Sequence, residues 1–296
     1  MKILVLGATG MLGHMACRVL SVDHDVSAVF RSSSANCCGI TNVIPAEACF
    51  PNTDCTGDLG QLALLLDTLA PDVVLNALGI VKQRAEATDP IESIRINALF
   101  PHQLARVCDM HDARLIQIST DCVFSGVRGA YEESDTPDPV DLYGRSKLLG
   151  EVLGDRHLTI RTSIIGPQPN GNTGLVAWLC SQRKGKIEGY VNAVFSGLTT
   201  HALCETINCV LQRSQFLSGL YHVASPAISK FELLDRLNKA LNLDIEIIRN
   251  TSFSCDRSLD DSLFRETTGI MKPSWTDMID QLTSDLFCNE YTDKRA

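Results

Sequence analysis

Short apolar runs alternate with longer amphipathic stretches along the first 163 residues. Runs of four or five apolar residues are typical of strands that are buried on both faces of a parallel sheet. They fall at 3–6, 26–30, 73–76, 115–119 and 158–161. The stretches between them predict helices at 11–20, 59–69, 90–111 and 142–153. Repeated strand–helix units predict an α/β fold built on a doubly wound parallel sheet.

The pattern changes after residue 163. Residues 164–174 are rich in Gly, Pro and Asn and predict a loop. We expect a helix near 175–184, a second helix that begins at 196–200, a short strand near 221–223, and a third helix that Ser229 caps and that runs to 241. We therefore expect a Rossmann nucleotide-binding domain at 1–163 and a smaller mixed α/β substrate lobe at 164–296, with segments near 190–225 returning to the sheet. The lobe should cover the carboxyl ends of the strands, where open α/β sheets bind ligands.

Three glycines spaced G-x-x-G-x-x-G lie directly between the first predicted strand and the first predicted helix. The first permits a tight turn, and the others allow backbone to approach a pyrophosphate and helix to approach sheet. The helix N-terminus favours negative charge. A plain tight turn is the alternative, but the position favours dinucleotide binding. The cofactor contacts predicted in this segment are Gly7, Thr9, Gly10, Met11, Leu12 and Gly13.

The end of the second predicted strand indicates which dinucleotide binds. An acidic residue there would bind the ribose hydroxyl and repel a 2′-phosphate, but this chain has Arg31 followed by Ser32 and Ser33. A guanidinium and hydroxyl groups suit a phosphate. This favours NADPH over NADH, although NADH use and a merely solvated Arg31 remain open.

Tyr143 and Lys147 lie four residues apart and so share one face of a helix. Carbonyl reduction needs a proton at the developing alkoxide, and a nearby cation helps a tyrosine to supply it. Lys147 can do this while it binds the nicotinamide ribose, and Thr120 can hold the carbonyl oxygen, with Ser119 as a substitute. We predict Thr120, Tyr143 and Lys147 as catalytic, against the alternative of an exposed tyrosine and a solvated lysine.

The glycine spacing resembles that of the extended branch of the short-chain dehydrogenases/reductases. Further segments match the branch: the Asp-Leu pair that it places beside the adenine, the segment after the fourth strand that lies along the cofactor, and Asn97 in the next helix. The cofactor contacts that this resemblance implies are Asp58, Leu59, Asn76, Ala77, Leu78, Gly79, Ser119, Tyr143 and Lys147.

Within that branch, residues 119–126 resemble the dTDP-4-dehydrorhamnose reductase family, as do 131–135, 141–151, 161–163, 257–260 and Trp275. Sugar-nucleotide dehydratases have Glu where this chain has Cys122, and the reductase family has Tyr there. The resemblance implies NAD(P)H-dependent reduction of the 4-keto group of a nucleotide-diphosphate 6-deoxyhexose. An epimerase or dehydratase of the same branch, or a non-catalytic NADP-binding regulatory subunit, is the alternative.

The substrate contacts are expected on both sides of the predicted cleft. Residues 81–83 are more basic than is usual in that family, so Lys82 or Arg84 could meet a diphosphate. Residues 196–200 differ from the family's sugar-site loop. The nucleotide base and the hexose configuration therefore stay open. The predicted substrate contacts are Lys82, Thr120, Asp121, Val123, Phe124, Trp178, Ser196, Thr199 and Arg257.

Composition and net charge limit the classes of binding partner that the chain is expected to have. The chain has 296 residues, with 45% hydrophobic and 21% charged residues, and a net charge of −9, which argues against nucleic acid or an anionic membrane as partner. No segment has the length of a membrane span, and the N-terminus does not resemble a signal peptide. We expect a cytoplasmic protein that binds a nucleotide sugar, with a homodimer possible.

The twelve cysteines and seven histidines show no metal-ligand spacing. Several cysteines fall in apolar segments, where free Cys behaves as a small hydrophobic residue. We predict reduced cysteines and no metal site. A divalent ion at Asp121 with Glu132 and Glu133 is the weaker alternative.

Overall fold

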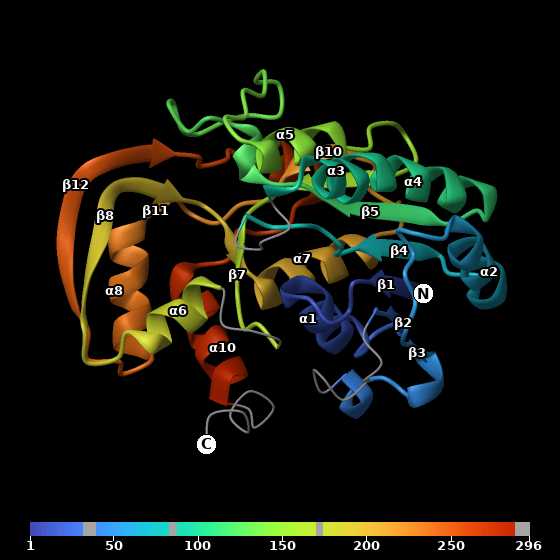
Figure 1. Cartoon of the computed structure of the whole chain (residues 1–296), viewed down its shortest axis with the longest axis horizontal. Coiled ribbons are helices and arrows are strands. Elements are labelled where there is room, and N and C mark those ends of the chain that lie inside the picture. The colour runs from blue at the N-terminus through green and yellow to red at the C-terminus, as the bar shows by residue number, and fades with distance from the viewer. Residues whose placement is uncertain (32–39, 83–87, 170–173, 288–296) are drawn as a thin grey trace.

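A seven-stranded parallel sheet forms the centre of the molecule, as the computed structural model shows in Figure 1. The structure describes residues 1–31, 40–82, 88–169 and 174–287. The predicted doubly wound sheet is confirmed. Its strands, in spatial order, are β10 (Gly219–His222), β6 (Leu158–Arg161), β5 (Arg114–Ile118), β4 (Val73–Asn76), β1 (Lys2–Leu6), β2 (Asp25–Val29) and β3 (Cys49–Phe50).

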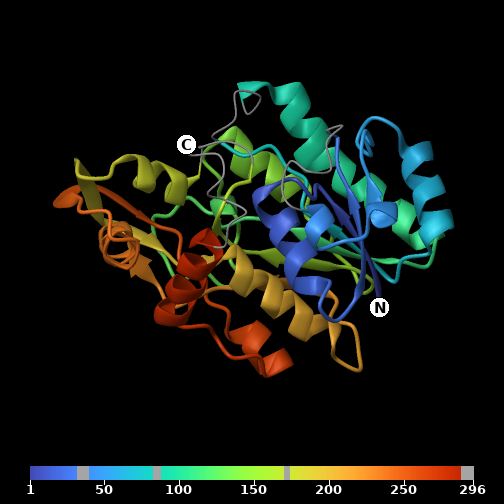
Figure 2. The same cartoon turned by 90° about the horizontal axis from the view of Figure 1, so that it is seen from below.

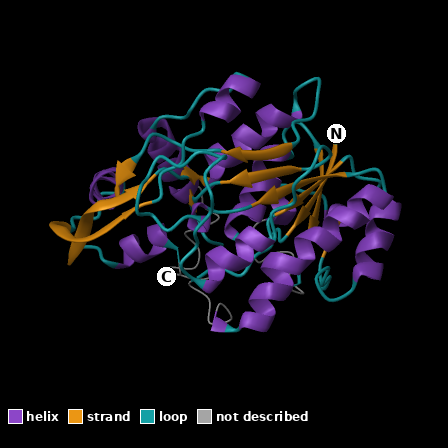
Figure 3. Ribbon diagram, turned by 90° about the horizontal axis from the view of Figure 1, so that it is seen from above, coloured by secondary structure: helices purple, strands orange, loops and turns teal. Residues whose placement is uncertain are grey.

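Each central strand is apolar on both faces because each face is covered by helices (Figure 3). In β1, Leu4 and Leu6 pack with the helices α2 (Leu59–Leu69) and α4 (Phe100–Met110). Ile3 and Val5 point to the opposite core, with α1 (Met11–Leu20) and α7 (Thr200–Leu211). The continuous apolar run therefore serves two cores at once.

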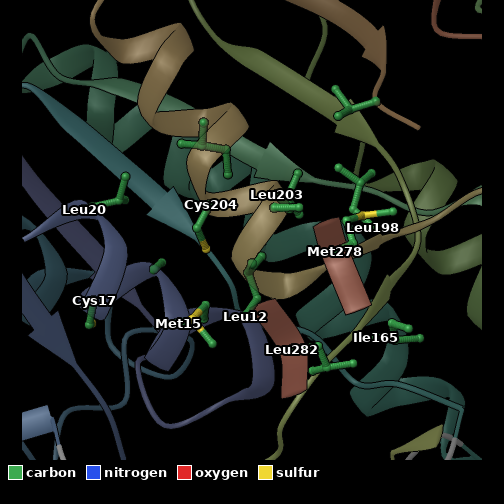
Figure 4. Close-up of a cluster of buried hydrophobic side chains, with 14 of the residues drawn as sticks. Leu12, Met15, Cys17, Leu20, Ile165, Leu198, Leu203, Cys204, Met278 and Leu282 are labelled. Carbon is green, nitrogen blue, oxygen red and sulfur yellow. The ribbon is translucent and has the colours of Figure 1, made fainter. Parts of the chain in front are cut away.

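The larger core joins the start of the chain to its end (Figure 4). Leu12 and Met15 of α1 lie near Leu203 of α7 and near Leu282 of α10 (Trp275–Phe287). All four side chains are at most 5% exposed. The C-terminal helix thus stabilises the helix that follows the glycine turn.

A three-stranded sheet forms the second lobe, at the end of the molecule away from β1–β3 (Figures 1 and 2). In its centre, β8 (Lys186–Phe195) pairs in parallel with β12 (Glu246–Asp256) and antiparallel with β11 (Ile228–Ser229). The helices α6 (Leu175–Ser181) and α8 (Lys230–Ala240) accompany it. The remaining elements are β7 (Ile164–Ile165), β9 (Leu198–Thr199) and α9 (Ser262–Thr268).

The chain returns to the main sheet late. β10 pairs with β6, although it follows residue 163 by more than fifty positions in the sequence. α7 packs against α1. The division of the chain at residue 163 stays a prediction, but any two-domain description must assign these returning segments to the sheet.

The helix predicted at 90–111 is interrupted. α3 (Pro90–Ser93) begins at its predicted Asp89 cap, a π-helical turn follows at Ile94–Leu99, and α4 begins at Phe100. Pro101 offers no N–H to the carbonyl of Asn97, so a regular helix would lose a hydrogen bond at this point. The helix predicted at 142–153 is also shorter: α5 spans Leu142–Leu149.

Candidate active site

The glycine turn connects β1 to the N-terminus of α1. Gly7 has φ +79°, a conformation that favours glycine, and its N–H donates to the carbonyl of Val29 at 3.1 Å. A side chain at Gly13 would place its Cβ 2.2 Å from the Gly7 oxygen. Gly10 is the N-cap of α1 and has no side chain to occupy the helix end. The turn therefore leaves the first N–H groups of α1 open to an anion.

The strands β4 and β5 end at the same edge of the sheet. Asn76, the last residue of β4, donates through Nδ2 to Gln117 Oε1 at 2.7 Å. Beyond β5, the Ser119 hydroxyl donates to Glu151 Oε1 at 2.6 Å. Glu151 is held in turn by a bidentate pair with Arg161, in which Nε and Nη2 each lie 2.8 Å from a carboxylate oxygen. The Ser119 hydroxyl is thus committed to a buried ion pair.

Thr120 caps a short 3₁₀ turn at Asp121–Val123. Its Oγ1 accepts from the backbone N–H of Cys122 at 3.1 Å and donates to Asp121 Oδ1 at 3.1 Å. The side chain is only 4% exposed. The turn therefore holds the Thr120 hydroxyl in one position at the cleft wall.

Close packing brings the helix of Tyr143 against this turn. Asp141 caps α5 by accepting from the N–H of Gly144 at 2.8 Å. A side chain at Gly144 would place its Cβ 2.2 Å from the backbone oxygen of Cys122. Because that position is glycine, α5 can approach the 3₁₀ turn, and the Tyr143 hydroxyl is within hydrogen-bond reach of Thr120.

Burial dominates the electrostatics of the two ionisable residues on α5. It raises the pKa of Tyr143, and the carboxylate of Asp121 acts in the same direction, whereas the hydrogen bond with Thr120 opposes it. Burial lowers the pKa of Lys147 to about 8, with the Glu151 carboxylate opposing the shift. Lys147 Nζ donates to the carbonyl of Ile118 at 2.6 Å. At neutral pH the tyrosine is therefore protonated and the lysine charged.

Lys82 lies beside Tyr143 but is already paired. Its Nζ is 2.6 Å from Asp141 Oδ2 and 5.5 Å from the centre of the Tyr143 ring. The pair ties the loop after β4 to the N-cap of α5. Asn97 adds a second tie, because its Oδ1 accepts from the N–H of Ile80 at 2.9 Å and its Nδ2 donates to Ser146 Oγ at 3.2 Å.

One cleft of about 670 Å³ brings most of the predicted residues together. Its size is within the range of small-molecule and cofactor sites. It runs from the start of α1, along the ends of β4 and β5, to the lobe. The predicted residues that line it are Gly10, Met11, Leu12, Asn76, Ala77, Leu78, Gly79, Lys82, Ser119, Thr120, Asp121, Tyr143, Lys147 and Trp178.

Other predicted residues have structural positions outside this lining. Asp58 caps α2, whose first residue is Leu59, by accepting from the N–H groups of Gly60 and Gln61. Val123 and Phe124 are fully buried in a cluster with Tyr131 and Leu259. Gly7, Thr9 and Gly13 belong to the turn and helix behind the lining, and Arg31 is exposed just beyond β2.

Three of the predicted substrate residues make hydrogen bonds within the protein. Ser196 Oγ accepts from the N–H of Leu259 at 2.9 Å, and Thr199 caps α7. Arg257 Nε donates to the carbonyl of Phe124 at 2.8 Å, and its Nη1 lies 3.8 Å from Cys122 Sγ. None of the three is among the residues that line the cleft.

Sequence reasoning missed Phe195 and Lys230, which line the lobe side of the cleft. Neither stands in a motif, and only the pairing of β8 with β11 brings them to the cleft. Ser32, Ser33 and Arg84 lie outside the described residues. Within the described ranges, no three His, Cys, Asp or Glu side chains group closely enough to hold a metal ion, and no helix is long and apolar enough to cross a membrane.

Comparison with known proteins identifies the family. Residues 1–286 match the family described as the RmlD substrate binding domain. The chain belongs to this family. The match covers nearly the whole chain, so both the nucleotide-binding sheet and the lobe are family features.

Individual relatives agree with this assignment. A crystal structure of a hypothetical dTDP-4-dehydrorhamnose reductase from Sulfolobus tokodaii is 30% identical, with a TM-score of 0.75 over 90% of this chain and 94% of that one. A dTDP-4-dehydrorhamnose reductase of Burkholderia thailandensis is 28% identical over 76% of this chain and 73% of its own length. A probable low-salt glycan biosynthesis reductase of Haloferax volcanii is 35% identical over 50% of this chain, and the match spans about half of that relative, 46%.

Proposed function

We propose that the chain reduces the 4-keto group of a nucleotide-diphosphate 6-deoxyhexose with NADPH as hydride donor. The observation that carries this proposal is the meeting of Thr120, Tyr143 and Lys147 in one cleft, between the glycine turn and the lobe. The names of the relatives, which are reductases of dTDP-4-dehydrorhamnose or of glycan biosynthesis, support the same chemistry.

The nucleotide end of the cleft fits a dinucleotide. The close approach of Gly13 to the Gly7 carbonyl keeps α1 tight against β1, so the helix N-terminus can hold a pyrophosphate. Arg31 is exposed just beyond β2, where a guanidinium suits a 2′-phosphate. When bound, NADPH supplies the hydride that reduces the carbonyl carbon.

The protein's own residues supply the proton. The Tyr143 hydroxyl keeps its proton at neutral pH because burial raises its pKa, so it can donate to the oxygen that becomes an alkoxide. Thr120 can hold that oxygen by turning its hydroxyl proton away from Asp121 Oδ1, and the Lys147 ammonium stabilises the negative charge left on Tyr143. The backbone N–H of Cys122 holds the Thr120 hydroxyl in place, so its position beside Tyr143 is set before the substrate binds.

Cys122 favours reduction over dehydration. Burial raises the pKa of its thiol to about 11, and the neighbouring Asp121 carboxylate acts in the same direction. A thiol in that state is a poor replacement for the glutamate of the sugar-nucleotide dehydratases. This supports a reductase that consumes its cofactor rather than an enzyme that regenerates it.

The test is NADPH oxidation with a panel of dTDP-, UDP- and GDP-linked 4-keto-6-deoxyhexoses. We expect one member to consume NADPH and to yield the corresponding alcohol. Tyr143→Phe should reduce kcat by at least a hundredfold while NADPH still binds, because general acid catalysis contributes about 10²–10⁴-fold. The matched control is Tyr190→Phe, which lies exposed on the lobe and should behave as wild type. Absence of turnover with every sugar, in protein that binds NADPH, would contradict the proposal.

A further inference from the structure

Lys230 is a partly buried cation on the lobe side of the cleft. It is the first residue of α8, and its Nζ lies 3.8 Å from the centre of the Phe195 ring. Both side chains line the same cleft as Tyr143. Within 1–31, 40–82, 88–169 and 174–287, no carboxylate lies within ion-pair distance of this ammonium group.

The other cations near this end of the cleft are already engaged. Lys82 Nζ pairs with Asp141 at 2.6 Å. Arg257 donates to the Phe124 carbonyl at 2.8 Å. Lys230 differs from both, because its ammonium group has no hydrogen-bond or carboxylate partner among the described residues and lies over the face of the Phe195 ring.

The position of Lys230 is unfavourable for a cation without a ligand. A helix N-terminus carries partial positive charge, which repels an ammonium group on the first residue. Burial lowers the pKa of Lys230, and the carboxylate of Asp121 only partly offsets this effect. The contact with Phe195 compensates for part of the lost hydration. An anion bound in the cleft would give the Lys230 ammonium group the opposite charge that it lacks.

We propose that Lys230 binds an oxyanion of the substrate, so that the lobe holds the substrate's charge while Thr120 and Tyr143 act on its carbonyl group. This inference rests on the proposed function and names its substrate class, an anionic sugar nucleotide. Two parts of such a substrate offer the same ligand chemistry. They are a phosphate of the nucleotide diphosphate and, if the sugar is a uronic acid in place of the 6-deoxyhexose, its carboxylate.

The experiment measures binding to the full chain with saturating NADPH by calorimetry. The variant is Lys230→Met, which keeps the apolar stem on Phe195 and removes the charge. The probes are dTDP, UDP and GDP, the matching nucleosides, UDP-glucose and UDP-glucuronate. A charged hydrogen bond of this kind corresponds to about a ten- to hundredfold change in Kd.

The pattern of losses identifies the source of the oxyanion. If Lys230 binds phosphate, Lys230→Met weakens the binding of a nucleoside diphosphate by that factor and leaves the affinity for the matching nucleoside unchanged. If it binds a sugar carboxylate, only the affinity for UDP-glucuronate falls. Lys230→Arg should restore most of the affinity in either case. Lys239→Met, an exposed position on the same helix, is the control and should match wild type.

Unchanged affinity of Lys230→Met for every probe that wild type binds would overturn the inference. So would a wild-type protein that binds none of them. NADPH affinity, and a second variant, Lys230→Gln, check that any loss does not come from misfolding. The proposed function is tested separately: a wild type that reduces no 4-keto sugar, yet loses anion binding through Lys230→Met, contradicts the function and not the anion site.

Discussion

Replacing Gly144 by alanine tests whether close packing of α5 creates the active site. The added methyl carbon would lie 2.2 Å from the Cys122 oxygen and 2.9 Å from Cβ of Pro139. Neither neighbour is the flexible end of a side chain. The helix must therefore move back by about an ångström to restore an ordinary contact, and Tyr143 moves with it. A displacement of about 1 Å can cost about a hundredfold in rate.

The expected result for Gly144→Ala is a kcat about a hundredfold below wild type with an NADPH Kd near that of wild type. Overpacking should also lower the free energy of unfolding by about 1–3 kcal/mol. Steady-state kinetics, cofactor titration and urea unfolding measure the three quantities. Leu149→Ala, on the same helix and 64% exposed, is the control that should leave all three nearly unchanged. A folded Gly144→Ala protein with wild-type kcat would refute the packing argument.

Four further predictions concern buried positions. Burial lowers the pKa of Lys147 from its ordinary 10.5 to about 8, so kcat/KM should fall as pH rises through about 8 and this charge is lost; a flat profile to pH 10 would contradict this. The same shift makes protein stability rise with pH between about 8 and 10.5, because the unfolded chain keeps this proton longer than the folded chain does. Glu151→Gln leaves the charge of Arg161 buried and should lower the free energy of unfolding by about 3–5 kcal/mol, whereas the exposed pair partner Glu246→Gln should have little effect in the same urea titration. Gly13→Ala should abolish NADPH binding measured by fluorescence, since its methyl carbon would lie 2.2 Å from a backbone oxygen of the glycine turn; unaltered affinity would count against that contact.

Local sequence patterns were enough to predict the nucleotide side of the molecule. Apolar runs marked β1, β4 and β6 because each is buried on both faces. Proline and polar caps marked the starts of helices, as at Asp89. The glycine turn, Thr120 and Tyr143 were recognisable because their chemistry depends on fixed spacing within single strand–helix units.

The lobe was less predictable because its structure depends on pairings between distant residues. β8 and β12 carry many exposed residues and pair across about sixty positions, so neither shows a continuous apolar run. The π-helical turn at Ile94–Leu99 ends two residues before Pro101, which offers no N–H to the carbonyl of Asn97. The end of α5 was also missed. The helix stops at Leu149 with Gly150 as its C-cap, and Gly150 lies so close to a distant residue that an added Cβ would be 1.9 Å from the oxygen of Asn97.

The charged residues show where sequence reasoning reaches its limit. Sequence alone marks Lys82 as a candidate for a diphosphate because it is a cation beside the cofactor segment, yet Asp141 already neutralises it. Lys230 has no motif and looks like an ordinary first residue of a helix, yet it lines the cleft without a carboxylate in ion-pair distance among the described residues. Whether a charge is available to a ligand depends on its neighbours in space. Local spacing can therefore point to candidate catalytic residues, whereas the charges that are open to a substrate can be recognised only in the folded lobe.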